Sequence, residues 1–73
     1  MERLDWDASY AIARLLRLKH PRADLQQVSL DMVFRWTLDL PEFDDDPELA
    51  NEEILQAIFL EWLEENLERG ENA

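Results

Sequence analysis

Cysteine is absent from the 73 residues, which excludes disulfides, thiolate metal sites and catalysis by a thiol. Histidine occurs once, as His20, directly after a helical pattern, and we interpret it as a helix-terminating residue that interacts with free carbonyl groups. No charged leader opens the chain, and no apolar run approaches the roughly 18 to 20 residues that span a bilayer. These absences predict a cytoplasmic protein that is not an enzyme.

Bases are nearly missing from the second half of the chain. Residues 36–73 contain thirteen acids and one base, Arg69, whereas residues 1–35 contain five acids and six bases. The second half therefore accounts for the whole net charge of −11. Such a field repels phosphate backbones and anionic membranes and favours basic proteins or cations, so neither nucleic acid nor membrane is an expected partner. Carboxylates that only keep a small domain soluble remain an alternative.

Apolar spacing and cap residues predict one all-α domain over residues 1–68 and a frayed acidic tail over residues 69–73. Three helices are expected, over residues 8–19, 30–38 and 52–69, with Gly70 ending the last one. Their expected N-terminal caps are Asp7, Ser29 and Asn51. Prolines at positions 41 and 47 enclose an acidic loop between the second and third helices, because proline disfavours helical geometry just before it.

Aromatic residues are expected to serve packing and not to bind a cofactor. Trp62 lies on the apolar stripe of the third helix, and Trp6 precedes the first helix, whose first turn it should contact like a staple. Phe43 is the one large apolar residue inside the acidic loop, and we expect its ring to anchor the loop on the core.

The acidic loop and its neighbours form a candidate site for a hard cation, because carboxylate oxygens suit such ions. The candidate metal residues are Asp39, Glu42, Asp44, Asp45, Asp46 and Glu48. Three successive side chains on an extended backbone do not all point one way, so binding should be weak. A solvated acidic turn without metal is the alternative that the residues alone favour.

Helix stability does not explain the acids near the C-terminal end of the third helix. Each carboxylate near this negative end of the helix dipole destabilises the helix by about a few tenths of a kcal/mol. We therefore interpret them, together with the loop, as a protein-binding surface. The candidate partner-binding residues are Asp44, Asp45, Asp46, Glu61, Glu64, Glu65 and Glu68.

Taken together, these residues resemble the IscX family of bacterial iron-sulfur cluster assembly proteins. The matching positions are Trp36, Leu38, Leu40, the segment FDDDP over residues 43–47, the segment NEEILQAI over residues 51–58, and Trp62. Trp6, Ser9, Pro21 and Val28 extend the likeness over nearly the whole chain. The chain departs from the family at Asp31, where the acid stands one place early, at Phe34, which replaces a usual histidine, and at Ala50, which replaces a usual serine.

The resemblance implies a compact three-helix domain similar to a modified winged helix, with an acidic surface that binds ferrous iron weakly. It also implies a monomer that docks on the cysteine desulfurase as a regulator and competes there with the bacterial frataxin homologue, with ferredoxin as a further partner. An iron carrier that supplies the assembly scaffold is the alternative function. A DNA-binding or DNA-mimicking module is a distant third, because the charge opposes DNA.

Overall fold

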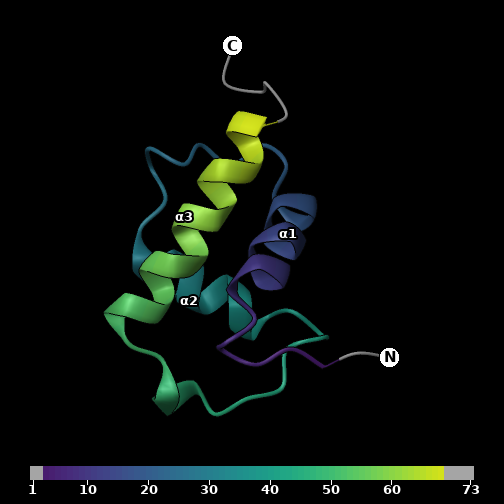
Figure 1. Ribbon diagram of the computed structural model, residues 1–73, viewed down its shortest axis with the longest axis vertical. Coiled ribbons are helices and arrows are strands. Elements are labelled where there is room, and N and C mark those ends of the chain that lie inside the picture. The colour runs from purple at the N-terminus through teal and green to yellow at the C-terminus, as the bar shows by residue number, and fades with distance from the viewer. Residues whose placement is uncertain (1–2, 69–73) are drawn as a thin grey trace.

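The computed structural model describes residues 3–68, which form three α-helices and one short 3-10 helix (Figure 1). In chain order these are α1 (Ser9–Lys19), α2 (Leu30–Leu38), η1 (Pro47–Leu49) and α3 (Glu52–Glu68). The all-α prediction is confirmed, since residues 3–68 contain no strand beyond an isolated pair of bridged residues. None of the helices in this range is long and apolar enough to cross a membrane. The predicted tail and Gly70 lie outside the described residues.

The core forms where α3 packs on both other helices. Ile58 and Trp62 of α3 are fully buried, as are Ile12 and Leu16 of α1 and Val33 of α2. Complete burial of each such side chain stabilises the fold by about 1.5–3 kcal/mol, before the conformational entropy lost on folding is set against it. Trp62 therefore lies on the buried side of α3, as its place on the apolar stripe predicted.

Two of the three predicted caps are present. The Ser29 hydroxyl accepts a hydrogen bond from the Met32 amide at 3.2 Å, and the Asn51 side-chain oxygen accepts one from the Ile54 amide at 2.9 Å. Each satisfies an amide that has no partner within its helix, a contribution of about 1 kcal/mol. The starts of α2 and α3 are therefore specified by these local signals.

The predicted cap of α1 is wrong. Ala8 occupies the cap position, without a side-chain hydrogen bond, and the Asp7 amide donates to Asp5 Oδ1 at 3.1 Å. The Ala8 amide also donates to the Asp5 carbonyl, at 3.0 Å. A turn organised by Asp5 thus precedes the helix, because its side chain bonds to the backbone two residues on.

Candidate functional site

The acidic loop, defined here as residues 41–47, is held by an N-terminal segment, residues 3–6. Leu4 and Phe43 form a parallel bridge. In it the Leu4 amide donates to the Glu42 carbonyl at 2.9 Å, and the Asp44 amide donates to the Leu4 carbonyl at 2.8 Å. Phe43 is partly buried against the core, which confirms the predicted anchor. Backbone pairing and a buried ring thus give the loop a fixed course.

Trp6 is the main attachment of this loop to the core. Its side chain is 3% exposed, its indole stacks on Phe34 of α2, and its ring meets Phe43 edge to face at 4.5 Å between centroids. The indole Nε1–H donates to the Asp46 carbonyl at 2.8 Å, and the Trp6 amide donates to Asp45 Oδ2 at 3.1 Å. The predicted packing role is confirmed, and the contacts extend beyond a helix staple, because the ring joins the acidic loop to α2.

The three consecutive aspartates of the loop have separate local roles. Asp44 pairs with Arg3 at 2.6 Å, and both side chains are exposed. Asp45 accepts a hydrogen bond at each oxygen, from the amides of Trp6 and Asp46. Asp46 Oδ1 accepts from the Glu48 amide at 2.9 Å and caps η1. These partners lie in different directions, so the three carboxylates do not converge on one point.

The other predicted metal residues flank the loop. Asp39 is exposed at the C-terminal cap of α2, and Glu48 is exposed in η1. Glu42 is partly buried, and its Oε1 is shielded from solvent without a hydrogen-bond partner. Within residues 3–68 no three acidic or histidine side chains lie close enough together to hold a metal ion. The donors suit a hard cation chemically, but in this arrangement they offer it few protein ligands at once.

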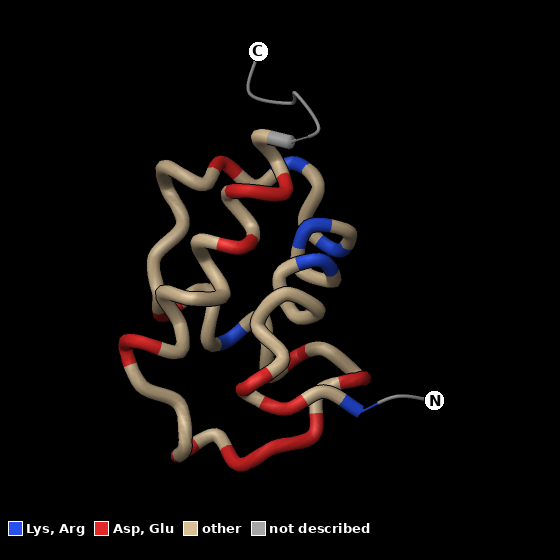
Figure 2. Tube along the Cα trace, viewed as in Figure 1, with Lys and Arg blue, Asp and Glu red and all other residues tan. Residues whose placement is uncertain are grey.

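The acids and bases are unevenly distributed along the folded chain, although three ion pairs join the two kinds of residue (Figure 2). Acidic residues gather along the loop and the first turn of α3, at the end of the molecule opposite to the last turn of α3. Basic residues gather on α1. The uneven charge of the sequence is therefore also uneven in space, and the acidic end faces solvent.

The four predicted acids of α3 differ in environment. Glu65 lies 3.3 Å from Arg17 Nε of α1, and the two side chains are only 13% and 14% exposed. Glu61 is partly buried and Glu64 is exposed. The side chain of Glu68 lies outside the described part of the structure. Of the acids that helix stability did not explain, Glu65 therefore has a structural partner on the neighbouring helix.

His20 terminates α1, but its ring has a different partner from the predicted carbonyls. The ring stacks on Trp36 of α2 with centroids 3.9 Å apart and planes inclined by 16°. Its backbone amide donates to the Leu16 carbonyl at 2.8 Å. Burial lowers the pKa of His20, while the negative charge of Asp39 opposes that change. The residue thus joins α1 to α2 as a neutral aromatic ring.

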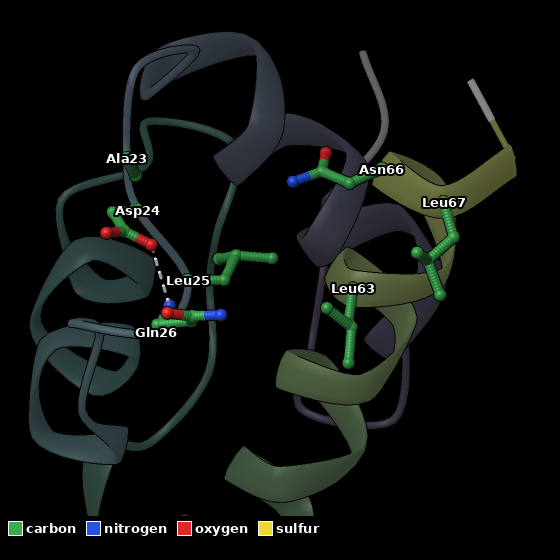
Figure 3. Close-up of a pocket in the computed structure, with 7 residues that line it drawn as sticks. All are labelled: Ala23, Asp24, Leu25, Gln26, Leu63, Asn66 and Leu67. Carbon is green, nitrogen blue, oxygen red and sulfur yellow. Dashed lines mark hydrogen bonds between the residues drawn. The ribbon is translucent and has the colours of Figure 1, made fainter. Parts of the chain in front are cut away.

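A surface pocket of about 300 Å³ lies at the other end of the molecule, between the α1–α2 connection and α3 (Figure 3). Leu25 and Asn66 extend toward each other across it. Asn66 Oδ1 is shielded from solvent and has no hydrogen-bond partner within residues 3–68. This pocket could not be predicted from the residues alone, because it depends on how the connection over residues 23–26 lies on α3.

Sequence reasoning missed two residues that shape the acidic site, Arg3 and Arg17. Arg3 pairs with Asp44 of the loop and Arg17 with Glu65 of α3, and neither arginine was among the predicted site residues. A signal was available for Trp6, because a buried indole requires a hydrogen-bond acceptor and the proline-bracketed loop has free carbonyls.

Comparison with known proteins identifies the family of this chain. A family model described as iron-sulphur cluster assembly matches residues 4–66. The uncharacterized protein PA3808 of Pseudomonas aeruginosa is 39% identical over 62 residues, which cover 85% of this chain and 94% of that protein. The match includes both the N-terminal segment that holds the acidic loop and the helix that follows it. The chain therefore belongs to the iron-sulphur cluster assembly family, the family of IscX, and has a role in cluster assembly.

Proposed function

We propose that this protein is a non-catalytic adaptor of iron-sulphur cluster assembly that docks on the cysteine desulfurase through its acidic end. The observation that carries the proposal is a rigid loop with unpaired charges around it. Asp46, Glu48, Glu52 and Glu53 are all exposed, and none forms an ion pair with a base among the described residues. Such carboxylates are available to the lysines and arginines of a partner.

Rigidity of the loop favours binding, because a surface that is already ordered loses little conformational entropy on association. The contacts of Trp6 and the Leu4–Phe43 bridge provide that order. Exposed charges mainly accelerate encounter, and salt screens them within about 8 Å at physiological ionic strength. The affinity for the desulfurase should therefore fall steeply as salt rises.

The test compares two double variants that change the net charge equally. Asp44→Asn/Asp46→Asn removes two of the four negative charges of the loop and keeps an oxygen to accept the Glu48 amide, whereas Asp45 stays unchanged because both its oxygens accept hydrogen bonds. Asp7→Asn/Asp31→Asn neutralises two exposed acids that lie outside the loop and do not line the surface pocket.

The affinity of each protein for purified desulfurase is measured by calorimetry across a range of salt concentrations. We expect the loop variant to bind roughly three- to tenfold more weakly than the wild type, with a shallower salt dependence. The control variant should match the wild type. Equal losses in both variants, or an affinity that salt does not change, would refute docking through the loop.

We also propose that the loop binds ferrous iron weakly, as cargo or as a modulator of docking. Support comes from the donor type, since every candidate ligand is a hard carboxylate oxygen. With diverging aspartates, one or two carboxylates would contact the ion and water would complete its shell. Ferrous iron should broaden amide NMR signals of residues 42–46 in the wild type and much less in Asp44→Asn/Asp46→Asn. Equal broadening in both would place the iron elsewhere.

A further inference from the structure

α3 has a second apolar face, and this one points to solvent. Its inner face is formed by Ile58 and Trp62, which are fully buried. On the opposite side Leu60 is 54% exposed and Leu67 is 50% exposed, and Ala57 is exposed as well. Single exposed leucines are ordinary on a protein surface, but here three apolar residues fall on one line of the same helix.

The spacing of this line is that of a helix-packing seam. Positions 57, 60, 64 and 67 alternate by three and four residues, the spacing at which one helix presents a continuous ridge to another. Adding position 53 extends the same alternation toward the start of α3. We call these five residues, Glu53, Ala57, Leu60, Glu64 and Leu67, the outer stripe.

Acids interrupt the apolar residues of the outer stripe. Glu53 and Glu64 are exposed and form no ion pair with any base in the described range. Glu53 favours the start of α3, but Glu64 stands toward the negative end of the helix, where a carboxylate is unfavourable. A base on a docked partner would supply the missing counter-charge.

The outer stripe ends at the surface pocket. Leu67 belongs to both, and Leu25 and Leu63 provide further apolar lining. An apolar ridge that leads into a pocket with apolar lining is suited to a partner side chain with an apolar body.

We propose that the outer stripe and the adjoining pocket bind an amphipathic basic helix of a partner protein. Heptad spacing on α3 is complementary to another helix, and the interspersed glutamates require lysine or arginine on it. A second copy of this chain is a poor occupant, because it brings a further net charge of −11 and glutamates of its own to the seam. The inference rests on the proposed adaptor function but concerns a surface that adjoins the acidic end at Glu53 and otherwise lies outside it.

The test uses two short synthetic peptides of identical composition. One has leucine along one helical face and lysine on the others, and the second has the same residues in scrambled order, which preserves charge and removes the apolar face. Binding to the wild-type protein is followed by amide chemical shifts and calorimetry. We expect the ordered peptide to bind on the order of tenfold more tightly and to shift amides of residues 57–67.

Matched variants of the protein separate this surface from charge alone. Leu60→Gln/Leu67→Gln removes the exposed leucines of the outer stripe and should abolish the preference for the ordered peptide. Leu18→Gln changes a leucine of α1 that is 57% exposed and should retain the preference. Equal binding of both peptides to the wild type, or the same loss in Leu18→Gln, would overturn the inference. Neither variant alters the acidic loop, so failure here is distinguishable from failure of desulfurase docking.

Discussion

Replacing Glu65 with glutamine should lower the free energy of unfolding by about 2 kcal/mol, because it leaves a guanidinium without counter-charge between two helices. Arg17 and Glu65 approach to 3.3 Å, and their side chains are 14% and 13% exposed. Solvent therefore screens the pair poorly and hydrates a solitary Arg17 poorly.

The magnitude follows from two opposing contributions. At 3.3 Å and an effective dielectric constant of about 20, the attraction of the two charges is about 5 kcal/mol. Desolvation of both groups offsets much of it, and removing one partner of a fully buried pair costs about 3–5 kcal/mol. The remaining exposure and the absence of an aligned hydrogen bond at Arg17 Nε place the expected loss below that range, at about 2 kcal/mol.

Urea unfolding followed by tryptophan fluorescence measures the effect, since Trp62 lies in the core beside α1 and α2. Asp44→Asn is the control, because its pair with Arg3 has side chains 79% and 58% exposed and should contribute less than about 1 kcal/mol. For a domain of this size, a loss of about 2 kcal/mol lowers Tm by roughly 8–16 °C. If Glu65→Gln were no more destabilising than Asp44→Asn, the structural role of Glu65 would be refuted and its carboxylate would be free for a partner.

Three further predictions concern the attachment of the loop, a helix start and pH. Trp6→Phe should lower the free energy of unfolding by about 1–3 kcal/mol, because the Asp46 carbonyl loses its indole donor, and hydrogen exchange should accelerate in the acidic loop; unchanged exchange would contradict the anchoring role. Ser29→Ala should cost about 1 kcal/mol in urea unfolding through the loss of the acceptor for the Met32 amide, whereas Ser29→Asp should keep most of the stability. Burial lowers the pKa of His20 below its ordinary value of 6.5. The contribution of His20 to stability is therefore present above pH 6.5 and is lost as the pH falls through the lower pKa of the folded protein. Wild-type protein should therefore lose more stability than His20→Phe on mild acidification, and parallel pH profiles of the two proteins would exclude this contribution.

Local signals in the sequence predicted the positions of α2 and α3. At Ser29 and Asn51 a side-chain oxygen accepts a hydrogen bond from an amide three residues later. Because such a cap involves only neighbouring residues, it can be recognised in one sequence. The same reasoning misplaced the cap of α1, because Asp7 has the right residue type and Asp5 turns the chain first. Residue type alone does not decide between two acids that both stand near a helix start.

Contacts between distant segments could not be predicted in the same way. The two hydrogen bonds from Trp6 to the acidic loop span sequence separations of 39 and 40 positions. The single bridged pair beside them is too short to create a periodic pattern in the sequence. The Arg17–Glu65 pair likewise depends on the rotation of α1 and α3 about their axes. Apolar periodicity fixes that rotation only to the width of a helix face, which is too coarse to match one arginine with one glutamate.

Acids that look equivalent in the second half of the sequence differ in how much of their charge is available to a partner. Asp45 uses both oxygens within the fold, and Glu65 faces Arg17, so docking on either carboxylate would have to break contacts that stabilise the free protein. Glu48 and Glu64 are exposed and unpaired within the described residues, so a partner base gains their attraction without that loss. The effect of each acid on binding should therefore follow the freedom of its carboxylate and not its place in the sequence.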